Sequence, residues 1–158
     1  MLPVFNSDVA WELGTIIRTC LQQKHNRPAV VYIAHANSSQ LLFFATSRPG
    51  TFPDNMQRAK RKEAVVLTWR LSSLHVLAQI KHLLPYRTVQ ESLSYMFEVA
   101  DPSGYTCRGG GFPIRVKNVE GIVGVIVVDG LQRGEDNHGV IVDCIQEYLA
   151  PNSPKYLK

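Results

Sequence analysis

The sequence predicts an α+β fold in which helices at both ends of the chain cover an antiparallel sheet. Apolar residues near each end of the chain recur at three- and four-residue steps, the period of an amphipathic helix. Two pairs of short β-branched runs lie between these helices, and a turn joins the members of each pair. Parallel strands need long crossover connections, so strands paired through short turns favour an antiparallel sheet over a doubly wound parallel one.

The first half of the chain predicts a helix, a hairpin and a second helix. The expected elements are a helix from Ser7 to about Lys24, strands over 29–34 and 41–45, and a helix from about Asp54 to Arg70. Asn6 or Ser7 is the expected N-cap of the first helix, because a short polar side chain there accepts a free backbone N–H. Asp54 or Asn55 is expected to cap the second.

The second half predicts two further strands, with helices before and after them. The expected elements are a helical or extended piece over 74–84, a short helix from Thr88 to about Glu98, strands over 112–116 and 121–128, and a helix from about Glu135 or Asp136 to Leu149. Thr88 and Glu91 have the spacing of a capping box. One domain over 1–158 is expected, with a core over about 6–150 and a frayed tail at 151–158.

Composition bounds the class of protein. Hydrophobic residues make up 45% and charged residues 19% of the 158 residues, a balance that disfavours disorder. The net charge of +4 is a mild excess, too small for a committed nucleic-acid binder, and favours at most a weak preference for anions. The longest apolar run, 122–128, is too short to span a bilayer. We therefore expect a cytoplasmic protein with no nucleic-acid partner and no membrane insertion.

The three cysteines are Cys20, Cys107 and Cys144. Their number is odd, they are far apart in the sequence, and none has the spacing of a zinc site. Reduced thiols are therefore expected, with neither a disulfide framework nor a bound metal.

A glycine-rich segment, Gly109 to Gly111, directly follows Arg108 and precedes an apolar strand. Its backbone N–H groups are candidates for an anion-binding nest. The alternative is a tight crossing of two backbones or an oligomer contact, because glycine allows an approach that a Cβ would block. A phosphate-binding P-loop is excluded, since no Gly-Lys-Ser/Thr follows and the next element is a strand.

Motifs in the expected order along nearly the whole chain resemble one known family. They are Asp8 to Gly14; Leu42-Phe43 with Pro49-Gly50-Thr51 and Pro53-Asp54-Asn55; Arg61-Lys62 with Val65-Val66 and Ser72-Ser73; Tyr105 with Gly109-Gly110 and Phe112-Pro113-Ile114; and Gly130-Leu131 with Glu135-Asp136 and His138. The chain resembles the short branch of the HbpS/GlcG-like superfamily, whose members are often labelled "haem-degrading domain".

This resemblance implies a profilin-like fold, with a central antiparallel sheet of about five strands and helices packed on both faces. It also implies homo-oligomers, but no reaction. Arg108 stands where the family pattern has histidine. A guanidinium neither ligates a metal nor titrates near neutral pH, unlike an imidazole.

The candidate ligand-binding residues are Arg61, Lys62, Arg108, Gly109, Gly110 and His138. Arg61 and Lys62 share a helical face with Arg58, which suits an anion site or, alternatively, a solvated or ion-paired face. His138 is expected in the first turn of the last helix, as a ligand or acid–base group or as a capping and packing residue. The other four histidines are interpreted as surface or packing residues.

No catalytic residues are predicted, because the sequence contains no nucleophile elbow, no zinc-protease motif and no dinucleotide fingerprint. The leading interpretation is a non-catalytic, homo-oligomeric domain without a cofactor, which binds a small anionic molecule or serves as an adaptor for a protein partner. The alternative is a redox protein that binds or degrades haem.

Overall fold

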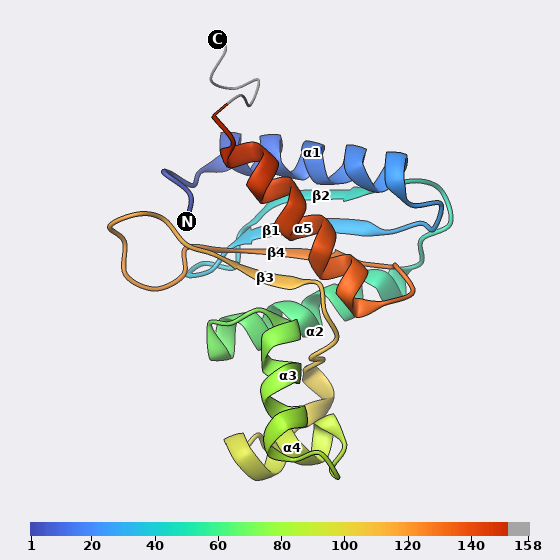
Figure 1. The fold of residues 1–158 in the computed structure, drawn as a ribbon, viewed down its shortest axis with the longest axis vertical. Coiled ribbons are helices and arrows are strands. Elements are labelled where there is room, and N and C mark those ends of the chain that lie inside the picture. Colours follow the sequence, from blue (N-terminus) through green and yellow to red (C-terminus); the bar gives the residue numbers. More distant parts are fainter. Residues whose placement is uncertain (152–158) are drawn as a thin grey trace.

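A four-stranded antiparallel sheet forms the centre of the computed structural model, which describes residues 1–151 (Figure 1). The strands are β1 (Val30–His35), β2 (Leu41–Thr46), β3 (Gly111–Ile114) and β4 (Gly124–Asp129). Their order across the sheet is β2-β1-β4-β3, and every neighbouring pair is antiparallel. The predicted α+β class and both predicted strand pairs are confirmed, and the two pairs meet where β1 lies beside β4.

The sheet has four strands within the described residues, close to the expected number of about five. Near β3, Leu2 makes a single parallel bridge to Val116. Its N–H donates to the carbonyl of Arg115 at 2.8 Å, and its carbonyl accepts from Lys117 at 3.0 Å. The N-terminal segment thus adds only this one bridge to the sheet. The chain enters helix α1 at Ser7, so no longer strand forms there.

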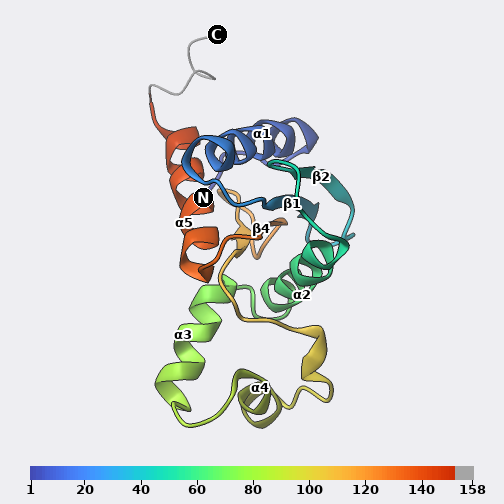
Figure 2. The ribbon, with the colours of Figure 1, turned by 90° about the vertical axis from the view of Figure 1, so that its right-hand side faces the viewer.

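Helices cover both faces of the sheet, as predicted (Figures 1 and 2). The helices are α1 (Ser7–Lys24), α2 (Pro53–Trp69), α3 (Ser73–Leu83), α4 (Val89–Phe97) and α5 (Gly134–Leu149). Helices α1 and α5 lie together on one face, and α2 lies on the other (Figure 2). Helices α3 and α4 extend away from the sheet below α2 and form a small lobe with its own core around Val76, Ile80 and Leu93 (Figure 1).

Strand β1 is apolar on both sides because both faces of the sheet are covered. Val31 and Ile33 belong to the core shared with α1 and α5. Tyr32 and Ala34 point the other way and belong to the core beneath α2. Alternate residues of a strand face opposite sides of a sheet, so a centrally placed strand reads as one continuous hydrophobic run.

The helix ends test the capping predictions. Asn6 caps α1 by accepting a hydrogen bond from the backbone N–H of Val9 at 3.0 Å, and Thr88 and Glu91 form the predicted capping box of α4. The caps predicted for α2 are wrong. Phe52 occupies the N-cap position, and the Asn55 side chain instead accepts from the Phe52 N–H at 2.8 Å.

Two further segments of the chain are defined by the structure. The piece over 74–84, left open between helix and strand, is the helix α3, and Ser72 caps it. Asp129, which lies just beyond the strand predicted over 121–128, is the last residue of β4 and is buried. Of the predicted frayed tail, 152–158 lies outside the described residues. Within residues 1–151, no helix is long and apolar enough to cross a membrane.

Candidate functional site

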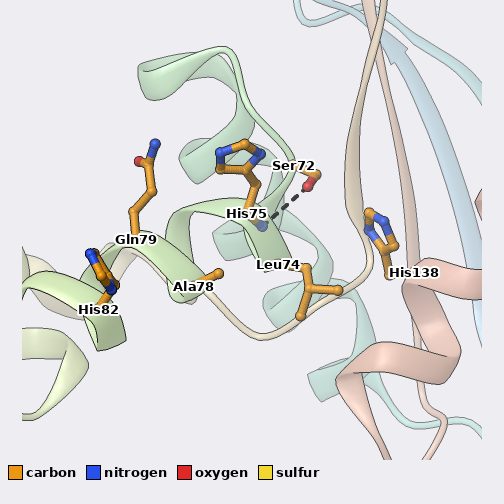
Figure 3. A pocket seen from close by; sticks show the side chains of 7 residues that line it. All are labelled: Ser72, Leu74, His75, Ala78, Gln79, His82 and His138. Carbon is orange, nitrogen blue, oxygen red and sulfur yellow. Dashed lines mark hydrogen bonds between the residues drawn. The ribbon is translucent and has the colours of Figure 1, made fainter. Parts of the chain in front are cut away.

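A surface groove of about 520 Å³ lies between α3 and the start of α5. Its lining residues are Ser72, Leu74, His75, Ala78, Gln79, His82 and His138. Figure 3 shows His138 on one side, the α3 residues on the other, and Leu74 between them. The groove therefore gathers three of the five histidines of the sequence.

The α3 side of the groove is a stripe on one helix face. His75, Gln79 and His82 are spaced four and three residues apart, so they lie above one another along the helix, and all three are exposed. Ser72 begins this side as the N-cap, and its hydroxyl accepts a hydrogen bond from the backbone N–H of His75 at 3.2 Å. The N-terminal end of an α-helix carries partial positive charge, which suits an anionic group at this end of the groove.

His138 forms the opposite side of the groove and has an unusual environment. Its Nδ1 is buried and has no hydrogen-bond partner among the described residues. Its ring packs at a tilt against Phe112 of β3, with 5.6 Å between ring centroids. Burial lowers the pKa of His138, so the imidazole is neutral at neutral pH. The neutral imidazole is the form that binds metal ions, and a buried nitrogen without a partner is an exception in native proteins.

A buried cluster of charges lies elsewhere, where α2 crosses the end of β4. The Lys62 side chain is fully buried, and its ammonium lies 2.9 Å from a carboxylate oxygen of Asp129 and donates to the Val128 carbonyl at 3.0 Å. The same carboxylate accepts hydrogen bonds from Arg58 and Asn55, each at 3.0 Å. Burial raises the pKa of Asp129, but Lys62, Asn55 and Arg58 outweigh burial and hold that pKa below its ordinary value.

The glycine segment is a close crossing of backbones. A Cβ on Gly109 would collide with the carbonyl of Gly134, and a Cβ on Gly110 would collide with the carbonyl of Val128. Gly110 also has a φ of +124°, which side chains other than hydrogen rarely allow. Its carbonyl accepts from the Val128 N–H at 2.8 Å, and the N–H of Gly111 donates to Ser73 Oγ at 2.9 Å. This geometry fits the crossing interpretation better than an open nest.

The six predicted site residues therefore do not come together in one site. Lys62 and Gly110 meet at the end of β4, where the Lys62 ammonium already has its partners. The Arg108 guanidinium donates to the Gln132 carbonyl. Arg61 is half-buried on α2, where its carbonyl accepts from the Thr106 N–H at 3.3 Å. His138 faces the groove without the other five.

Sequence reasoning missed Asp129, His75 and His82. The signal for Asp129 was a single acidic residue at the end of an apolar strand, where a carboxylate needs a buried partner. The signal for His75 and His82 was their seven-residue spacing, which places both on one face of a helix. Within residues 1–151, no group of three or more His, Cys, Asp or Glu side chains is arranged to hold a metal ion.

Comparisons with known proteins agree with the sequence motifs. A family model described as "Haem degrading protein HbpS-like" matches residues 5–146. A UPF0303 protein of Zymomonas mobilis is 36% identical over 148 residues, which cover 94% of this chain and 73% of that protein.

Among solved structures, the Ybr137w protein has a TM-score of 0.78 at 23% identity, with 91% of this chain and 78% of that chain covered. The structure of a PduOC:haem complex has a TM-score of 0.66 at 14% identity, with 92% and 94% covered. Likenesses at such low identity show a shared fold alone. The match of the family model over most of the chain shows more: this chain belongs to the haem degrading protein HbpS-like family.

Proposed function

We propose that this chain is a non-catalytic domain that binds a small anionic ligand, haem in particular, in the groove between α3 and α5. The observation that carries this proposal is the imidazole of His138, which is held neutral by burial and has an unpartnered Nδ1 at the side of a groove of about 520 Å³. Pockets for small molecules and cofactors in proteins range from about 300 to 1,000 Å³, so the groove has a suitable size.

The residues of the groove fit the chemistry of haem. When bound, haem would supply an iron that histidine side chains can ligate. His138 would offer its neutral imidazole from one side, and the side chains of His75 and His82 line the groove on the α3 side. The N-terminal end of α3 at Ser72 suits the carboxylates of the ligand. Leu74 and Ala78 add apolar surface for the ring.

The comparisons support haem over other anions, because the matching family description names haem and one solved structure of the same fold is a haem complex. The proposal is limited to binding. The buried thiol of Cys107 has its pKa raised by burial to about 11. A thiol with such a pKa is protonated at neutral pH and is a poor nucleophile.

Haemin titration tests the proposal. We expect the wild-type protein to shift and sharpen the Soret band of haemin in a saturable manner. We expect His138→Ala to weaken binding about tenfold or more, since an iron ligand or its support is lost. His25→Ala is the matched control, because His25 lies at the end of α1 outside the groove lining. Equal affinity in both variants would remove His138 from the site, and no spectral change with wild-type protein would contradict haem binding.

Self-association is a second proposal, supported by the outer strand β2. This strand lies at one edge of the sheet and contains neither a charged residue nor proline. Two of its large side chains are exposed, Leu41 by 49% and Phe44 by 41%. Proteins usually protect such edges with charges, prolines or bulges. The pairing of β2 with β1 shifts register between Ile33 and Ala34, but β2 has neither a charge nor a proline, and this apolar edge favours pairing with a second copy of the same strand. The adaptor interpretation remains a prediction.

We expect native mass spectrometry to show a multimer of the wild-type chain, and Phe44→Lys to shift the population toward smaller assemblies. Val119→Lys is the matched control, because Val119 is also 49% exposed but lies in the connection between β3 and β4. A monomeric wild-type protein would contradict self-association. A multimer that Phe44→Lys leaves intact would place the interface away from β2.

A further inference from the structure

The two edges of the sheet differ in what they offer to another strand. Strand β2 forms one edge and β3 forms the other. An antiparallel edge strand directs the N–H and carbonyl of every second residue away from its neighbour, toward any further strand that could pair with it. An edge can therefore accept a second copy of the protein only where these outward groups have no partner already.

The outward groups of β3 are not available to another strand. The Gly111 N–H points away from β4 and donates to Ser73 Oγ at the start of α3, at 2.9 Å. The next outward position is Pro113, which has no N–H to donate. Just beyond the strand, Leu2 pairs with the chain on either side of Val116. In the described part of the chain, β3 thus offers no free N–H to a partner strand.

The outward groups of β2 are covered only at the end of the strand. Helix α1 lies over β2 (Figure 2), and Arg18 Nε donates to the outward carbonyl of Thr46 at 2.8 Å. Gln22 Nε2 donates to the carbonyl of the next residue, Ser47, also at 2.8 Å. Phe44 lies two residues before Thr46, so its N–H and carbonyl also point outward from β1. The available part of this edge is therefore centred on Phe44.

Large apolar side chains flank Phe44 on both faces of the sheet. On the α1 face, Trp11 is 66% exposed and its ring meets the Phe43 ring edge-on, with 5.7 Å between ring centroids. On the other face, α2 packs over β4, β3 and part of β1, and leaves the side chains of Leu41 and Phe44 exposed. A strand paired with this edge would shield all three exposed side chains from water, which favours association.

We propose that two copies of the chain pair through β2, antiparallel and related by a two-fold axis, with Trp11, Leu41 and Phe44 as the apolar anchors of the interface. This inference rests on the self-association proposed above and adds its geometry. Because β3 offers no free N–H, β2 of one copy cannot pair with β3 of the next. Pairing through the sheet edge therefore closes at two copies and does not grow into a filament.

Tryptophan fluorescence tests the position of the interface. The sequence has two tryptophans, Trp11 and Trp69. Trp69 packs against Phe97 in the small lobe, so Trp69→Phe leaves Trp11 as the only reporter. We expect this variant to emit at a shorter wavelength when it is associated, because the partner strand shields Trp11. Dilution should shift the emission to a longer wavelength, and Phe44→Pro should do the same at high concentration.

Two substitutions at Phe44 separate the main chain from the ring. Phe44→Pro removes the outward N–H, as Pro113 does on β3, and should weaken association about a hundredfold or more. Phe44→Ala keeps the N–H, removes only the ring and should weaken association about tenfold. Analytical ultracentrifugation measures both effects, and circular dichroism checks that each variant is folded. If the wild-type assembly holds more than two copies, Phe44→Pro should halve their number.

The outcomes distinguish this interface from self-association in general. A monomeric wild-type protein would contradict self-association itself. A multimer that Phe44→Pro leaves intact, with Trp11 emission that does not change on dilution, would leave self-association standing but overturn its assignment to β2. Wild-type protein that grows into filaments through β2 would contradict closure at two copies.

Discussion

Asp129→Asn is expected to destabilise the fold by about 3–5 kcal/mol, because it leaves the ammonium of Lys62 buried without its counter-charge. The Lys62 side chain has no exposed surface, and its remaining partner is the Val128 carbonyl at 3.0 Å. Arg58 and Asn55 also lose the carboxylate that accepts their hydrogen bonds. Urea denaturation followed by circular dichroism measures the loss as a change in the free energy of unfolding.

Asp54→Asn is the matched control. Asp54 also pairs with Arg58, but its side chain is 62% exposed, so its removal is expected to change the free energy of unfolding by at most about 0.5 kcal/mol. The double variant Lys62→Met with Asp129→Asn removes both buried charges and should recover most of the lost stability. Equal effects of Asp129→Asn and Asp54→Asn would contradict the buried ion pair.

The carboxylate of Asp129 should also affect how the free energy of unfolding changes as the pH falls. Because the pKa of Asp129 is lowered in the folded chain, its contribution is present above the ordinary aspartate pKa, near 4, and is lost as the pH falls through the lower folded value. Stability measured from neutral to acid pH should therefore fall less steeply in Asp129→Asn than in wild-type protein.

Gly110→Ala is expected to destabilise the fold by about 3 kcal/mol or more, or to prevent folding. The φ of +124° strains any side chain, and the new Cβ would collide with the Val128 carbonyl. It would also lie 2.9 Å from the Lys62 ammonium nitrogen and 2.9 Å from the Cβ of Asn137. Relief of this clash would separate Gly110 from β4 and break its hydrogen bond to Val128.

Gly104→Ala is the control in the same segment of chain. An added Cβ at Gly104 meets no atom within 4 Å, and its φ is not positive. We expect thermal melting to be nearly unchanged in Gly104→Ala and strongly lowered in Gly110→Ala. A Gly110→Ala variant that melts like wild-type protein would show that the two backbones do not cross closely.

The helices and strands were predictable where local signals are strong. The apolar spacing of α1, its Asn6 cap and the box formed by Thr88 and Glu91 are local patterns, and each is confirmed. The cap of α2 was not predictable in this way, because Phe52 has no capping oxygen. Instead, the N–H of Phe52 donates a hydrogen bond to the side-chain oxygen of Asn55, which lies inside the helix.

The candidate site was only partly predictable, because it depends on contacts between distant segments. His138 was identified from the sequence, but the groove exists only because α3 lies beside the start of α5. Lys62 was predicted to bind an anion because it shares a helical face with Arg58 and Arg61. It is instead fully buried, where lysine almost always has a partner within the protein. That partner, Asp129, lies 67 positions away in the sequence, and no local pattern links the two.

A crystal structure of the protein grown with haemin tests the central claim most directly. The account predicts electron density for the porphyrin between α3 and α5, with the iron within bonding distance of an imidazole nitrogen of His138, His75 or His82. Porphyrin bound elsewhere on the chain, with this groove empty, would contradict the assignment of the groove as the ligand site.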